Sequence, residues 1–112
     1  MSEQAVRLLQ GYLWAPRELA WDAELELPPK IELDGAEVSL LVDPISPPFA
    51  FFDDGTPTAS QRFYQLTALV ITERDPNTLH PWVEALQERL APVLEATPEG
   101  VGWLLFEDLR AL

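Results

Sequence analysis

The residues that could perform chemistry in this sequence are few and widely spaced. The single histidine, His80, stands directly before Pro81, and any Ser–His–Asp triad would have to use it. None of the four serines lies in a Gly-x-Ser-x-Gly elbow. The pattern therefore favours an exposed or capping histidine at a helix start, and we expect no catalytic residue here.

A pair of carboxylates in the middle of the chain could bind a hard cation. Asp53 and Asp54 precede Gly55, and Mg²⁺ and Ca²⁺ prefer oxygen ligands of this kind. The pair lacks the Asp-x-Asp-x-Asp-Gly spacing of a calcium loop, and Asp-Asp-Gly is more typical of a turn. We predict no metal and no cofactor, and keep Asp53, Asp54, Arg62 and His80 as candidates for a small-ligand site.

The composition excludes several classes of protein. Among 112 residues, seven basic and nineteen acidic side chains give a net charge of −12, which repels phosphate backbones and argues against nucleic-acid binding. The absence of cysteine excludes disulfides, thiolate zinc sites and thiol chemistry. No apolar run approaches the ~18 residues of a membrane span. The N-terminus lacks the pattern of a signal peptide, so we expect a cytoplasmic protein without membrane contact.

Half of this net charge lies between residues 18 and 37, where seven acids accompany one base, Lys30. Asp34-Gly35 predicts a two-residue hairpin turn, which places Glu32 opposite Glu37 on the polar face. Like charges in that position are mildly destabilising, so this face either remains solvated or meets a basic partner. The candidate partner-binding acids are Glu24, Glu26, Glu32 and Glu37, on one acidic sheet face over residues 20–39.

A second candidate contact surface is aromatic. The connection 43–61 is rich in proline and carries Phe49, Phe51 and Phe52, and the chain also contains four tryptophans. These rings either seal the ends of a small core or contact a second chain. A long connection of this kind is often functional.

Apolar periodicity predicts the elements in the N-terminal half. Val6, Leu9 and Leu13 have helical spacing after the N-cap residue Ser2, which predicts a short helix over 3–13. Strict alternation predicts a strand over 19–27, resumed at 31–33 after two prolines. A further alternating strand is expected over 36–42.

In the C-terminal half, residues 62–73 predict a central strand that is apolar on both faces. An amphipathic stripe from Leu79 to Leu94 predicts a helix that Pro92 should kink or end near residues 88–91. Residues 101–112 fit either a strand or a helix, and we favour a strand as far as Phe106 followed by a terminal turn. The sequence thus predicts one α+β domain over 1–112: an antiparallel sheet of about four strands, with the short N-terminal helix and the later helix packed on it.

Three functional hypotheses remain open. The first is a small non-catalytic interaction module that binds itself or another protein. The second is a small-ligand binder or modest enzyme with a pocket between sheet and helix, and the third is a structural component of a larger assembly. Six of the seven basic residues are arginine and eleven residues are proline, which fits either a heat-stable protein or a GC-rich genome.

Overall fold

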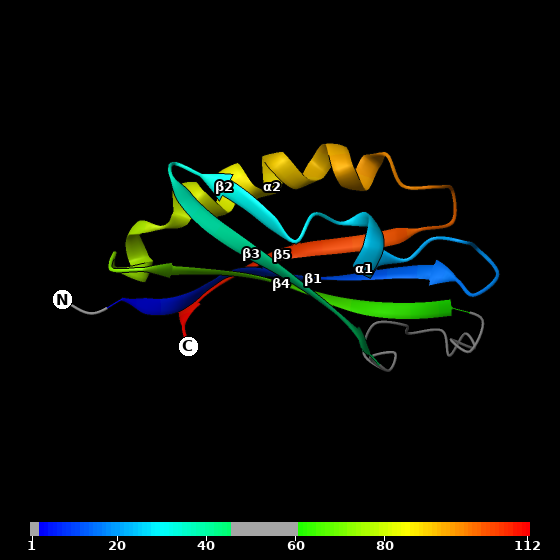
Figure 1. Cartoon of the computed structure of the whole chain (residues 1–112), viewed down its shortest axis with the longest axis horizontal. Helices are drawn as coiled ribbons and strands as arrows, with labels where there is room; N and C mark the ends of the chain where they lie inside the picture. Colours follow the sequence, from blue (N-terminus) through cyan, green and yellow to red (C-terminus); the bar gives the residue numbers. More distant parts are fainter. Residues whose placement is uncertain (1–2, 46–60) are drawn as a thin grey trace.

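A computed structural model describes residues 3–45 and 61–112 (Figure 1). Five antiparallel strands form one sheet in the order β2-β3-β4-β1-β5. The strands are β1 (Gln4–Pro16), β2 (Lys30–Leu33), β3 (Ala36–Ile45), β4 (Gln61–Thr72) and β5 (Gly102–Ala111). The helices are α1 (Ala23–Glu26), the 3-10 turn η3 (Pro76–Thr78) and α2 (His80–Glu95). The α+β class and the antiparallel sheet are confirmed, with one strand more than expected.

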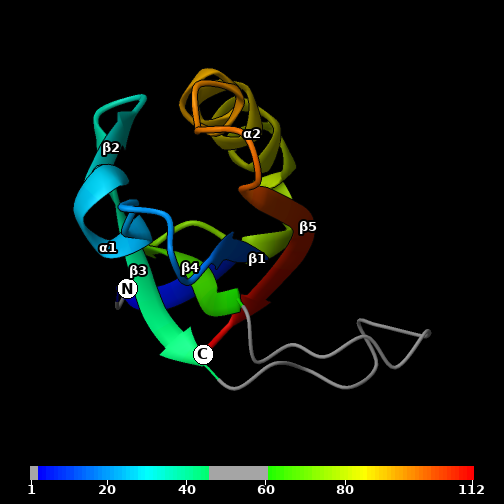
Figure 2. The ribbon, with the colours of Figure 1, turned by 90° about the vertical axis from the view of Figure 1, so that its right-hand side faces the viewer.

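The sheet curves around α2, so its two faces differ (Figure 2). On the inner face, α2 buries Trp82, Val83, Leu86, Leu90 and Leu94 in the hydrophobic core. Alternate residues of the strands complete this core, because side chains of a strand point to its two faces in turn. None of the helices in the described ranges, 3–45 and 61–112, is long and apolar enough to cross a membrane.

The predicted N-terminal helix is wrong, because Gln4–Pro16 forms strand β1 between β4 and β5. The register shifts between Arg7 and Leu9, which leaves Leu8 as an extra residue in a bulge. The extra residue shifts the inward-facing positions of the strand by one. Val6, Leu9 and Leu13 are therefore buried at a spacing that resembles that of a helix. Gly11 lies so close to β5 that an added Cβ would stand 2.5 Å from the Leu105 side chain.

The predicted strand over 19–27 is also wrong. The segment is a loop followed by the single helical turn α1, whose first turn is capped by the Asp22 carboxylate accepting from the Glu24 N–H at 3.0 Å. Trp21, Ala23 and Leu27 are buried, but Leu25 is 81% exposed, so the alternation does not correspond to one buried face. Residues that enter the core individually from a loop and a helical turn produced a pattern typical of a strand.

The hairpin prediction is confirmed in its elements and in its register. Glu32 pairs with Glu37, and Asp34 and Gly35 both have positive φ, as a type I′ turn requires. The central strand is confirmed as β4, and the stripe from Leu79 corresponds to α2. The helix continues through Pro92 to Glu95, so the predicted end near 88–91 is wrong. Leu94 is fully buried, and its packing holds the last turn in place despite the missing backbone donor.

The ambiguous tail is the edge strand β5, which runs to Ala111 and is longer than the segment 101–106 that we predicted. It pairs with β1 from Trp14↔Gly102 to Val6↔Ala111, with a register shift between Arg7 and Leu9. The C-terminal strand therefore lies beside the N-terminal one, and this pairing builds the surface described next.

Candidate interaction surface

The outer face of the sheet, away from α2, is defined by the strand register. Four rows of paired residues cross β3, β4, β1 and β5 in that order. They are Ser39, Leu69, Arg7 and Arg110; Leu41, Thr67, Gln10 and Phe106; Asp43, Gln65, Tyr12 and Leu104; and Ile45, Phe63, Trp14 and Gly102. Lys30 and Glu32 of β2, together with Glu37 of β3, continue the same face at the hairpin. Ile71, two residues beyond Leu69 in β4, and Asp108 of β5, which contacts Arg7, belong to it as well. We call this set of residues the outer face.

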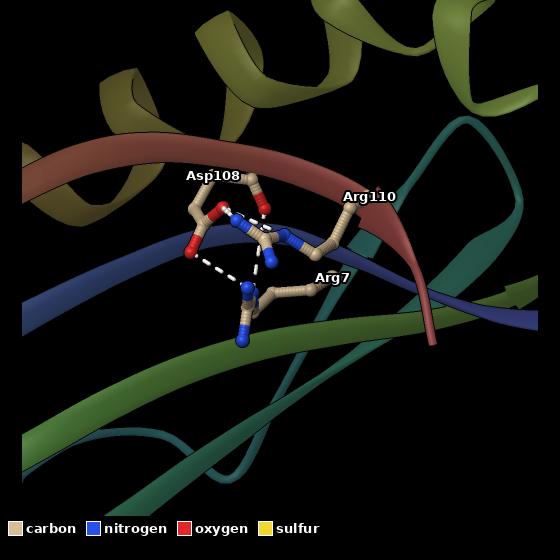
Figure 3. A network of polar contacts seen from close by, with 3 residues as sticks. All are labelled: Arg7, Asp108 and Arg110. Carbon is tan, nitrogen blue, oxygen red and sulfur yellow. Dashed lines mark hydrogen bonds and ion pairs between the residues drawn. The ribbon is translucent and has the colours of Figure 1, made fainter.

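An ion-pair network occupies the part of the outer face between β1 and β5 (Figure 3). The Arg7 guanidinium lies 2.7 Å from the Asp108 carboxylate, and Arg110 contacts the same carboxylate at 3.1 Å. The side chains of Arg7 and Asp108 are only 16% and 17% exposed. With its amide nitrogen turned toward Asp108, Gln10 donates to that carboxylate at 2.9 Å and accepts from Gln65 at 3.1 Å. The charges at this position are therefore partnered within the chain.

Apolar side chains lie around this network. Leu41, Ile71 and Leu104 are 45%, 60% and 46% exposed, although each is a large hydrophobic residue in a strand. The Tyr12 and Phe106 rings lie side by side, with their centroids 6.1 Å apart. Single exposed leucines are common on proteins, but several on one sheet face mark a surface able to bind another apolar surface.

The outer face differs from the rest of the chain in charge. It carries three basic side chains (Lys30, Arg7, Arg110) and four acidic ones (Glu32, Glu37, Asp43, Asp108), a net of −1. The other described residues carry four basic and thirteen acidic side chains, a net of −9. The outer face is therefore close to neutral in a strongly acidic chain.

The structure separates the four acids predicted to form one partner-binding face. Glu32 and Glu37 lie on the outer face, where Lys30 reaches diagonally to Glu37 at 2.8 Å. The pKa of Lys30 is raised, first by this hydrogen bond and then by the charge of Glu37. Glu24 and Glu26 belong to α1, so the expectation of one continuous acidic sheet face over residues 20–39 is wrong.

Arg62 has a structural role that the sequence did not reveal. It lies in β4 opposite Ala15, and its Nη2 donates to the backbone carbonyls of Leu19 and Trp21 at 2.7 and 2.6 Å. These bonds fasten the loop before α1 to the sheet. The Nε of the same side chain is buried without a hydrogen-bond partner.

His80 is the first residue of α2, and its Nδ1 lies 2.7 Å from the Glu107 carboxylate of β5. Both side chains are about half exposed. The contact joins the start of the helix to the edge strand, so two of the candidate ligand residues, Arg62 and His80, serve separate contacts in the fold. The other two, Asp53 and Asp54, lie outside the described residues, as do Phe49, Phe51 and Phe52.

The depressions in the surface are shallow and open. One of about 310 Å³ lies beside Glu24, Leu41 and Asp43, and one of about 220 Å³ lies between Trp21 and Thr97, where α1 meets the end of α2. Within residues 3–45 and 61–112, no group of three or more His, Asp or Glu side chains is placed to hold a metal ion.

Sequence reasoning missed the outer face itself. Its signal was the strand 62–73, whose apolar residues on both faces include Leu69 and Ile71. The signal stayed incomplete because Arg7 was assigned to a helix and Asp108 to a terminal turn. No local pattern pairs two residues 101 positions apart.

The chain belongs to the family described as a protein of unknown function, DUF3208, whose family model matches residues 3–112. No curated protein matches the chain.

Proposed function

We propose that this chain is a non-catalytic protein-interaction module and that its contact surface is the outer face of the sheet. The observation that carries the proposal is that three large apolar side chains, Leu41, Ile71 and Leu104, are exposed on the same sheet face. Surfaces that bind other proteins have an apolar centre and a polar margin. The strongly exposed charged groups, Lys30, Glu37 and Arg110, belong to the two flanks of the face, β2–β3 and β5.

The ion pair also favours burial of this face. Covering an unpaired charge costs several kcal/mol, whereas a charge that already has its partner costs much less. Arg7 and Asp108 are paired and largely shielded before any partner arrives. A partner therefore gains contact with the apolar side chains without having to neutralise a buried charge.

Site-specific thiol labelling tests the proposal. The chain has no cysteine, so an introduced cysteine reports on one position alone. The Ile71→Cys variant places the thiol on the outer face, and Leu25→Cys places it on α1, at the most exposed large apolar side chain of the described residues. In a concentrated extract of the producing cells, we expect maleimide to label the Ile71→Cys variant at least about 5-fold more slowly than in dilute buffer.

The Leu25→Cys variant is the matched control, because its thiol is exposed but lies outside the outer face. Its labelling rate should change little between extract and buffer, and both variants should react equally in denaturant. Equal rates for Ile71→Cys in extract and in buffer would show that nothing covers the outer face and would overturn the proposal.

A further inference from the structure

We propose that the partner of the outer face is a second copy of this chain, packed face to face about a two-fold axis parallel to the strands. This inference rests on the proposed function and adds the identity of the partner. Three observations lead to it: the distribution of net charge, the difference between the two halves of the outer face, and the size of that face.

The net charge of the chain limits which surfaces of two copies can come together. Two chains of charge −12 repel each other, and the repulsion is strongest where acidic groups face one another at short distance. The outer face has a net charge of −1, whereas the remaining described residues have −9. A second copy can therefore approach the outer face with the smallest electrostatic cost.

The two halves of the outer face differ in the sign of their net charge. On β2 and β3 lie one base and three acids, Lys30 with Glu32, Glu37 and Asp43. On β1 and β5 lie two bases and one acid, Arg7 and Arg110 with Asp108. The two-fold axis runs parallel to the strands, between the two packed sheets and over the boundary between β4 and β1. Rotation about it brings the acidic half of each copy against the basic half of the other. It places Ser39 opposite Arg110 of the second copy.

The outer face is large enough for a small interface. Four strands about 4.8 Å apart and seven residues of about 3.4 Å each outline a flat area of roughly 460 Å², before side-chain relief is counted. This area leaves out the end row, where Phe63 is only 3% exposed. A specific interface needs about 500 Å² per partner, so the face lies near the lower limit. Twisted sheets pack face to face with their strands nearly aligned, which is the orientation that this axis produces. Because the sheet curves around α2, the central strands β4 and β1 make the closest contact (Figure 2).

Sedimentation equilibrium of the full chain tests the proposal. We expect a dimer mass for the wild type and at least about a 10-fold rise in the dimer dissociation constant for Ile71→Glu, which buries a charge in the interface. Leu25→Glu is the control, because it adds the same charge to an apolar position on α1. A wild-type mass of one chain at every concentration would overturn the inference, as would equal effects of the two variants.

Two further measurements test the electrostatics. Raising the salt concentration from about 0.05 M to about 0.5 M screens the repulsion between the acidic chains, so the dimer should tighten. A complex with a basic partner would weaken instead. Arg110→Glu should raise the dissociation constant by about 3-fold or more, whereas the same change at Arg89 on α2 should have a smaller effect. A dimer that weakens as the salt concentration rises contradicts the expectation that repulsion between the acidic chains dominates, and a dimer that ignores Arg110→Glu contradicts this axis.

Thiol labelling distinguishes failure of this inference from failure of the proposed function. Self-association predicts that purified Ile71→Cys protein becomes protected as its own concentration rises. Protection in extract, combined with a purified monomer, leaves the interaction module in place but assigns its partner to another protein. The absence of protection in both experiments rejects both proposals.

Discussion

The two faces of the sheet are built from the same strands but differ in how far their apolar side chains are buried. On the inner face, α2 covers the apolar residues completely, and Leu86 and Leu90 have no exposed surface. On the outer face, large apolar residues stay exposed, and the charged pair Arg7–Asp108 lies among them. The inner face therefore supplies most of the buried apolar surface, while the outer face keeps part of its apolar surface exposed.

The same comparison explains the charge of the molecule. The bulk value of −12 suggests a uniformly acidic surface, yet the outer face is close to neutral and the acids concentrate on the rest of the chain. A net charge therefore describes how a protein behaves at long range, where fields add up. It does not describe the surface that touches a partner.

The largest expected effect tests the inner face. Leu90→Ala removes a fully buried side chain, so the free energy of unfolding should fall by about 2–5 kcal/mol. Leu41→Ala on the outer face should cost less than about 1 kcal/mol, because this side chain is already half exposed. Urea denaturation of dilute protein measures both. Comparable losses would mean that the outer face is packed as tightly as the core.

A smaller effect is expected at the ion pair. Asp108→Ala leaves the guanidinium of Arg7 shielded without its partner and should cost about 1–3 kcal/mol in urea denaturation. Replacing both side chains, with Arg7→Leu and Asp108→Leu, should recover most of this loss, since no shielded charge is left unpaired. Arg110, which also loses its contact with Asp108, is 64% exposed and stays solvated. A double variant as unstable as Asp108→Ala would show that the pair stabilises the sheet beyond satisfying its own charges.

The inner face also predicts a loss of stability at alkaline pH. Burial raises the pKa of the Tyr64 phenol, although the positive charge of Arg62 opposes the shift. The unfolded chain has an ordinary tyrosine pKa of about 10, so it releases this proton first. The resulting stability is fully present below about pH 10 and is lost as the pH rises through the pKa of the folded state.

The Tyr64→Phe variant tests the source of that loss. It keeps the buried aromatic ring and lacks only the phenol hydroxyl, the group whose pKa burial raises. Its decline in stability above pH 10 should be shallower, as measured by urea denaturation along a pH series. An equally steep decline would assign the alkaline loss to other groups.

The smallest effect concerns the hairpin on the outer face. Glu32→Lys replaces a like-charged pair by an opposite one across from Glu37 and should stabilise the fold by about 0.2–1 kcal/mol. The same change at Glu24 on α1 should give no such gain, because that residue has no partner across a strand. Thermal unfolding compares the two. A loss at Glu32 would mean that Lys30 already balances the pair through its contact with Glu37.

The elements predicted correctly are those determined by residues close in sequence. The Asp34-Gly35 turn and the alternation on either side of it specify the hairpin register, and the stripe from Leu79 to Leu94 specifies α2. The N-terminal strand could not be predicted in this way. Its bulge at Leu8 disturbs the alternation, and its extended conformation depends on β4 and β5, whose residues are about 50 to 100 positions away.

The candidate site follows the same division. The acids Glu32 and Glu37 were placed correctly opposite each other, because a two-residue turn sets that pairing locally. Arg7, Asp108 and the exposed Ile71 were not assigned to the site, because only the order of strands in the sheet brings β1, β4 and β5 onto one face. Arg62 was considered a possible ligand residue, yet tertiary contacts direct it to the carbonyls of Leu19 and Trp21.

The sequence by itself determined the α+β class, the hairpin with its register, the central strand and the long helix, because each depends on periodicity or on a turn within a few residues. Only the tertiary structure decided that the chain begins with a strand, that residues 19–27 form no strand and that the acidic segment is divided between α1 and the hairpin. These outcomes depend on pairing between distant segments, where the free energy gained by burying side chains outweighs local preference.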